Sequence, residues 1–158
     1  EQKPVAVGEC GLDYVKIKDR NRQRYFFDEQ IALATRFDLP LIIHSVHATE
    51  DVTDLLKSHS KSRGVIHAYS GSLQQAEILL NMNFFFGFGH SLANPHAYKL
   101  HDIAKFLPLE MILIETDDYK NPDELIQIAE RIARIKKLAV EQVVEQCDLN
   151  ACNLFNIS

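Results

Sequence analysis

Five short apolar segments are spaced along the chain, and longer stretches with helix-like periodicity separate them. The apolar segments show no alternation of apolar and polar residues, which is typical of strands that are buried on both faces of a parallel sheet. The five segments are residues 5–9, 39–44, 64–69, 84–89 and 111–117. The pattern therefore predicts five strands of a parallel sheet.

The stretches between these segments carry signals of helix formation. Residues 22–37 place their apolar side chains on one stripe, as expected for a helix that packs against a core. A capping box opens a helix over residues 72–80. Asn-Pro pairs at residues 94–95 and 121–122 each combine an N-cap residue with proline at the first helical position. A last helix is expected over residues 140–155.

Regular alternation of strands and helices predicts a parallel sheet with right-handed crossover connections. Two architectures are compatible with this order, an open doubly wound sheet and a (β/α) barrel. No G-x-G-x-x-G motif follows any expected strand, so dinucleotide binding has no support. The strand-helix order alone leaves both architectures open, and we expect residues 1–158 to form a single α/β domain.

Composition and charge restrict the classes of partner. The chain has 158 residues with a formal net charge of −5, a size that suits one domain. An acidic protein that acts on nucleic acid would have to hold phosphates through bound cations and a few local Lys or Arg residues. Three cysteines without C-x-x-C spacing predict reduced thiols and a cytoplasmic location. No apolar run is long enough to cross a membrane.

Residues of metal-ligand type stand at the ends of the apolar segments. Glu9, His44, His67 and Asp117 close the first, second, third and fifth segments, and His90 follows the fourth. Alone, each could be a hydrogen-bonded core histidine, a helix cap or a loop aspartate. Together they favour a metal site, because the carboxyl ends of barrel strands meet at one rim. Imidazole and carboxylate ligands suit Zn²⁺ or Mn²⁺, and carboxylates alone suit Mg²⁺.

Four motifs resemble those of the TatD-type metal-dependent deoxyribonucleases. Residues 7–14, VGECGLDY, resemble the family's G-E-x-G-L-D-Y segment. Residues 39–45, LPLIIHS, look like its L-P-v-i-I-H-S strand, and residues 64–72, GVIHAYSGS, are similar to G-V-x-H-x-F-S-G-S. Residues 113–117, LIETD, match L-L-E-T-D. The resemblance covers essentially the whole chain, and it implies an α/β fold of the (β/α) TIM-barrel type.

The resemblance implies a two-metal site for phosphodiester hydrolysis. Glu9 would bridge two divalent ions (Mg²⁺, Mn²⁺ or Zn²⁺), and His44 and His67 would complete the coordination of the second ion. Asp117 would bind the first ion and would position or deprotonate the attacking water. Glu9 and Asp117 are therefore the catalytic candidates. His90 is a candidate contact to the substrate.

Three features depart from the family pattern. The opening H-x-H strand, which supplies two ligands to the first ion, does not occur in this sequence. Val46-His47 stand where the family usually has an arginine after H-S, and residues 118–120 replace a longer proline-bearing loop. We expect the chain to be the C-terminal portion of a longer protein, with the last five of eight barrel strands. Its sheet edges would be covered by the missing N-terminal barrel segment or by another chain.

The sequence therefore predicts a metal-dependent phosphodiesterase, with DNA or a small phosphodiester as its substrate. Two alternatives remain open. One is an amidohydrolase-like enzyme that acts on a small ester or amide. The other is a non-catalytic, metal-binding relative, which the absent H-x-H motif favours and the four retained ligands weigh against. A redox or nucleotide-binding open sheet has no matching glycine or cysteine motif.

Overall fold

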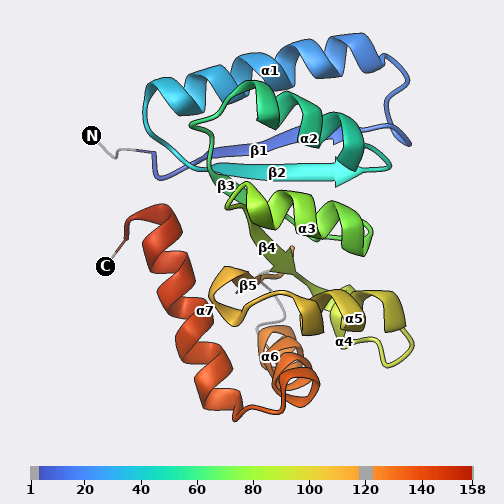
Figure 1. Cartoon of the computed structure of the whole chain (residues 1–158), viewed down its shortest axis with the longest axis vertical. Helices are drawn as coiled ribbons and strands as arrows, with labels where there is room; N and C mark the ends of the chain where they lie inside the picture. Colours follow the sequence, from blue (N-terminus) through green and yellow to red (C-terminus); the bar gives the residue numbers. More distant parts are fainter. Residues whose placement is uncertain (1–3, 118–122, 158) are drawn as a thin grey trace.

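A computed structural model describes residues 4–117 and 123–157 of the chain. These residues form one sheet of five parallel strands in the order β1-β2-β3-β4-β5, shown in Figure 1. The strands are β1 (Val7–Asp13), β2 (Leu41–Val46), β3 (Gly64–Ile66), β4 (Phe85–Phe88) and β5 (Ile112–Ile114). A doubly wound sheet reverses its strand order at a switch point, and this sheet has no such reversal. The sequential order is that of a TIM-type barrel.

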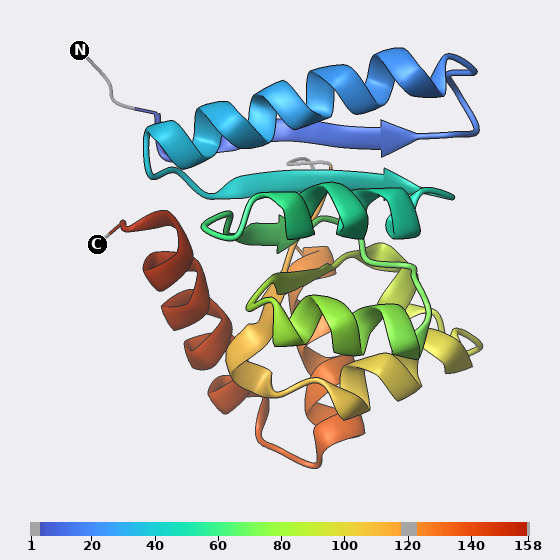
Figure 2. The same ribbon diagram turned by 45° about the horizontal axis from the view of Figure 1, so that its top comes forward.

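The helices that follow the strands cover one face of the sheet, as Figure 2 shows from a second direction, and the last helix of the chain lies at the amino ends of the strands. The helices are α1 (Arg20–Arg36), α2 (Thr49–Ser58), α3 (Leu73–Asn81), α4 (His90–Ala93), α5 (Tyr98–Phe106), the 3₁₀ turn η1 (Leu109–Met111), α6 (Asp123–Lys136) and α7 (Val140–Phe155). Neighbours along the layer contact each other, α1 with α2, α2 with α3, α3 with α5 and α5 with α6, and α6 in turn contacts α7. None of the described helices is both long and apolar enough to span a membrane.

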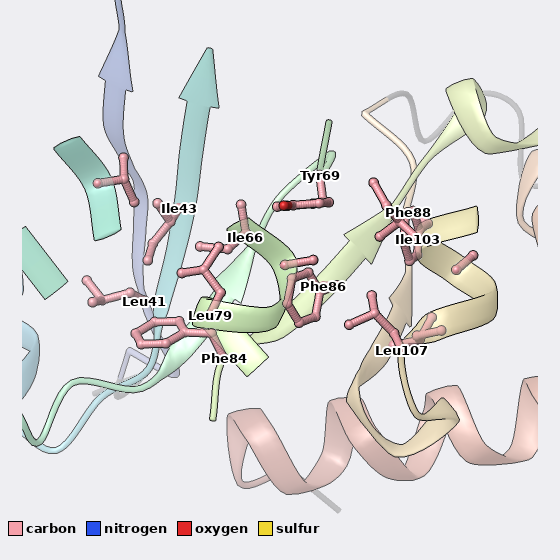
Figure 3. Close-up of a cluster of buried hydrophobic side chains, with 14 of the residues drawn as sticks. Leu41, Ile43, Ile66, Tyr69, Leu79, Phe84, Phe86, Phe88, Ile103 and Leu107 are labelled. Carbon is pink, nitrogen blue, oxygen red and sulfur yellow. The ribbon is translucent and has the colours of Figure 1, made fainter. Parts of the chain in front are cut away.

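The main core lies between the sheet and this helical layer. Figure 3 shows the side chains of β2, β3 and β4 that point into it, among them Ile43, Ile66 and Phe86. A smaller cluster on the opposite face contains Val65 and Leu113, which pack with Leu154 of α7. Both faces of the strands are therefore apolar, which accounts for segments without in-and-out alternation.

The first two strands extend further than the sequence pattern predicted. β1 continues past Glu9 to Asp13, and β2 continues past His44 to Val46. Gly11 permits the extension, because its φ is +137° and a Cβ there would lie 2.0 Å from the carbonyl oxygen of His44. The prediction that Glu9 and His44 end their strands is therefore wrong, and both lie inside them.

The helix starts agree with the sequence in one place and differ in another. The capping box is confirmed, since Ser72 and Gln75 exchange both side-chain-to-backbone hydrogen bonds. Asn94, in contrast, ends α4 instead of starting a helix. Its side chain accepts a hydrogen bond from the backbone N–H of His96 and its carbonyl accepts one from Ala97, which makes a turn before α5. The Asn121-Pro122 pair lies outside the described residues.

The two outer strands leave open sheet edges. Among residues 4–117 and 123–157, no strand pairs with the outer edge of β1 or of β5. Large apolar side chains are exposed beside β1, including Ile17, Phe26 and Phe37. The described part of the chain therefore has the strand order of a barrel wall and does not close into a barrel.

Candidate metal centre

The acidic and imidazole side chains predicted from the sequence meet at the carboxyl rim of the sheet. Glu9 Oε1 lies 2.9 Å from His44 Nδ1 and 3.9 Å from His67 Nε2. His67 Nε2 in turn lies 3.0 Å from Asp117 Oδ1. The structure thus brings Glu9, His44, His67 and Asp117 together, with Glu9 between the two imidazoles. Their roles as metal ligands remain predictions.

Local backbone features place these side chains. The pairing of β1 with β2 shifts between Val7 and Cys10, so Glu9 lies where β1 carries an extra residue, an irregularity that redirects side chains. His67 directly follows β3, and its backbone N–H donates to the carbonyl of Ile43 at 2.8 Å. The parallel pairing therefore continues to the residue whose side chain enters the site.

His44 is held by carboxylates on both ring nitrogens. Its Nδ1 faces Glu9, and its Nε2 lies 3.3 Å from Asp13 Oδ2. The other oxygen of Asp13 accepts hydrogen bonds from the backbone N–H groups of Lys16 and Val15, at 2.8 and 2.9 Å. The bond from Lys16 contributes most to lowering the pKa of Asp13, so this carboxylate is ionised and fixed in place.

His67 carries a proton more readily than an ordinary histidine. Its Nδ1 lies 2.9 Å from Glu115 Oε1. This hydrogen bond is the largest cause that raises the pKa of His67 to about 9, and the charges of Glu115, Asp117 and Glu9 add to it. Because a cation binds only the deprotonated nitrogen, metal binding at His67 would release this proton.

His90 lies near the cluster and does not join it. It opens α4 with a side chain that is 77% exposed, and its Nδ1 is 3.6 Å from Glu124 Oε1. His90 does line the same cavity of about 190 Å³ as His67, Glu115 and Asp117. The structure thus places His90 on the wall of this cavity, which Glu9 does not line.

The donor set suits a divalent cation in chemical type and spacing. Two ligands bound to one ion at about 2.1 Å lie about 3.0–3.4 Å apart, and the nitrogen–oxygen distances from 2.9 to 3.9 Å are of this order. Within the described residues, however, no group of three or more His, Cys, Asp or Glu side chains is arranged to hold an ion. The donors contact each other directly, so small side-chain rotations would be needed for them to converge on a cation.

The site contains two further residues that the sequence patterns did not predict, Asp13 and Glu115. Each lies inside a motif whose predicted ligand is another residue, and each contacts an imidazole. Glu115 stands two positions before Asp117, a spacing that puts both side chains on one face of an extended segment. The spacing could therefore have predicted that Glu115 lies at the site beside Asp117. No such pattern predicts the contact between Asp13 and His44, because that contact depends on how β1 pairs with β2.

Comparison with known proteins agrees with the fold and with the motifs. The sequence profile described as "TatD related DNase" matches residues 1–156. The uncharacterized metal-dependent hydrolase YabD of Bacillus subtilis is 35% identical, over 99% of this chain and 67% of its own length. The uncharacterized metal-dependent hydrolase YjjV of Escherichia coli is 33% identical, over 98% of this chain and 65% of its own length.

The crystal structure of E. coli YjjV, a TatD homolog, superposes with a TM-score of 0.88 and 32% identity. The match covers 97% of this chain and 64% of the YjjV chain, and it confirms the expected TIM-barrel type of fold. The chain thus spans about two thirds of the length of the relatives it matches. On the strength of the matched profile, the shared motifs and the common fold, the chain belongs to the TatD-related DNase family.

Proposed function

We propose that this protein is a metal-dependent hydrolase that cleaves phosphodiester bonds, with DNA as its substrate class. The observation that carries the proposal is the convergence of Glu9, His44, His67 and Asp117 on one rim of the sheet. The family description and the relatives named as metal-dependent hydrolases support it.

Each side chain has a role that suits its position. Glu9 Oε1 is close to both imidazoles, so Glu9, His44 and His67 would together hold one divalent cation, and the family resemblance would give Glu9 a share in a second cation as well. Asp117 has a side chain that is 82% exposed, so it can reach a water molecule and accept its proton. A bound divalent cation would lower the pKa of that water and neutralise charge on the phosphate.

The acidic character of the protein is compatible with this substrate. A net charge of −5 repels a polyanion at long range, so we propose that bound cations supply most of the local attraction for phosphate. Cys10, Cys147 and Cys152 are free thiols, which supports a reducing, cytoplasmic setting.

We also propose that the free edge of β1 is covered in the functional protein, by further barrel polypeptide or by another chain. A hollow of about 710 Å³ beside this edge is lined by Glu9, Asp13 and His44 together with Ile17 and Phe26. Further metal-binding side chains supplied from this side would complete the coordination of a cation held by Glu9 and His44.

Two measurements test the proposal. The first is titration of the chain with Mn²⁺ and with Zn²⁺ by calorimetry, for the wild type and for Glu9→Ala and His67→Ala. We expect binding in the wild type and its loss in both variants, whereas Glu130→Ala, on an exposed part of α6, is the matched control. Unchanged metal content in both site variants would refute the assignment.

The second measurement separates the substrate classes. We expect Mn²⁺-dependent nicking of supercoiled DNA and hydrolysis of bis(p-nitrophenyl) phosphate. Turnover of p-nitrophenyl acetate alone would indicate an ester or amide hydrolase instead.

A non-catalytic role is the second candidate. It is favoured by the lack of a ready-made ligand group among the described residues and by the absence of an H-x-H motif from the sequence. Metal binding without turnover of any of these substrates would support it.

A further inference from the structure

Glu115 has a carboxylate that is enclosed by three strands of the sheet. It directly follows β5, and its backbone N–H donates to the carbonyl of Phe88 in β4 at 3.1 Å. The side chain is only 19% exposed. This carboxylate is therefore part of the wall of the site, whereas that of Asp117, two residues later, extends into solvent.

One oxygen of Glu115 accepts two hydrogen bonds from the segment after β3. Oε1 lies 2.9 Å from His67 Nδ1 and 2.5 Å from the backbone nitrogen of Ala68. Ala68 has a φ of +45°, a left-handed conformation that costs a residue with a side chain about 1 kcal/mol. Glu115 thus holds both the imidazole ring and the strained backbone that follows it.

The opposite side of the carboxylate is fitted to a glycine. A Cβ built on Gly87 of β4 would lie 2.2 Å from Oε2 of Glu115 and 2.6 Å from its carboxyl carbon. Any larger residue at position 87 would therefore displace the carboxylate from His67. The Glu115 carboxylate therefore occupies the space that a side chain at position 87 would need.

We propose that Glu115 is a positioning residue for the metal centre: it fixes the ring of His67 so that Nδ1 donates to Glu115 and Nε2 faces Glu9 and Asp117. A neutral imidazole has one donor nitrogen and one acceptor nitrogen. Once Nδ1 carries the hydrogen, the lone pair that can bind a cation is on Nε2. Carboxylates that hold a metal-binding histidine in this way typically change metal affinity by about 10–100-fold. The inference rests on the proposed function of His67.

Metal titration of two variants tests the inference. In Glu115→Gln the side chain keeps its size and loses its charge, and we expect the Mn²⁺ affinity to fall by about 10–100-fold. In Gly87→Ala the carboxylate is intact and displaced, and we expect a change in the same direction. Glu130→Gln, an equivalent change on the exposed face of α6, should leave the affinity unchanged. If Glu115→Gln retains the wild-type affinity and melting temperature, the proposal is overturned.

A second readout does not depend on metal binding. The Nδ1–H proton of His67, protected by its bond to Glu115, should give a slowly exchanging signal in ¹⁵N–¹H spectra of the wild-type chain. We expect this signal to disappear in Glu115→Ala and to persist in Glu130→Ala. A signal that survives in Glu115→Ala would overturn the positioning role. A wild-type chain that shows the signal and binds no cation would instead contradict the proposed function and leave the contact itself established.

Discussion

The helix-covered face of the sheet and its carboxyl rim are made by the same strands and are stabilised in different ways. Phe86 on the covered face has no exposed surface and packs edge-to-face on Tyr69, with ring centroids 5.1 Å apart. Glu9 at the rim has a side chain that is 49% exposed and contacts other polar groups. Burial of apolar surface stabilises the first region, whereas the rim consists of contacts between carboxylates and imidazoles, and polar contacts of this kind are worth little when they are exposed.

We therefore expect stability and metal chemistry to be separable in this protein. Replacing a residue of the covered face should lower the free energy of unfolding and leave the affinity of the folded rim for cations unchanged. Replacing a rim residue should do the reverse. Four substitutions, ordered from the largest expected effect on stability to the smallest, test this separation.

Phe86→Ala should have the largest effect on stability. The substitution removes a fully buried ring and leaves a cavity, which costs about 3–5 kcal/mol. Urea denaturation monitored by circular dichroism measures this loss. Phe37→Ala, at a site that is 60% exposed, is the matched control and should cost much less. Equal losses at the two positions would contradict the difference in burial between Phe86 and Phe37.

Asn150→Ala should have the next largest effect and tests a polar group within the buried region. The Asn150 side chain donates to the carbonyls of Leu109 and Ile112 at 2.8 and 2.7 Å and thereby joins α7 to β5. Removing it leaves buried acceptors without this donor, at a cost of about 1–3 kcal/mol. Thermal melting of this variant should differ clearly from that of Asn153→Ala, an exposed position on the same helix. Identical melting temperatures would show that these bonds contribute nothing.

Asp51→Asn should have a small effect that depends on pH. Asp51 accepts a hydrogen bond from the Tyr14 hydroxyl and lies 2.6 Å from Arg24. The bond from Tyr14 is the main cause that lowers the pKa of this carboxyl. The variant should lose at most about 1 kcal/mol at neutral pH, since the pair is partly exposed.

The sign of the pH dependence follows from the lowered pKa. The stabilisation is fully present above the unfolded-state pKa of about 3.9. It disappears as the pH falls through the lower folded-state pKa. Wild type and variant should therefore converge in acid, as denaturation at several pH values would show. A difference that grows in acid would contradict this assignment, and Asp54→Asn, at the exposed pair with Lys57, is the control.

Glu9→Ala should have the smallest effect on stability and the largest on chemistry. Because the side chain is half-exposed, we expect the free energy of unfolding to change by less than about 0.5 kcal/mol, while Mn²⁺ binding measured by calorimetry is lost. A clearly lower free energy of unfolding in Glu9→Ala would show that the rim also stabilises the fold. It would contradict the separation of stability from metal chemistry.

Several features could be predicted from the sequence because their causes are local. Apolar runs and periodic stretches predict the five parallel strands and the helices between them, and the structure confirms the capping box at Ser72. The residue types at positions 9, 44, 67 and 117 pointed to one rim, and the structure brings those residues together. Parallel strands align their carboxyl ends whatever their detailed register.

Other features depend on contacts between residues that are distant in the sequence. Glu9 lies within a strand because β1 pairs irregularly with β2 and continues through Gly11. Asn94 forms a turn although the Asn-Pro pair predicted a helix start. Local propensity is a weak constraint, and tertiary packing overrides it at such points.

By itself, the sequence determined the class of fold and the chemical types at the rim, since hydrophobic periodicity and ligand chemistry belong to the residues themselves. Only the tertiary structure decided which carboxylates hold the two imidazoles. Glu115 and Ala68 are 47 residues apart in the chain, and no local pattern encodes their hydrogen bond. That contact exists because β3, β4 and β5 pack side by side and a glycine at position 87 leaves room for the carboxylate.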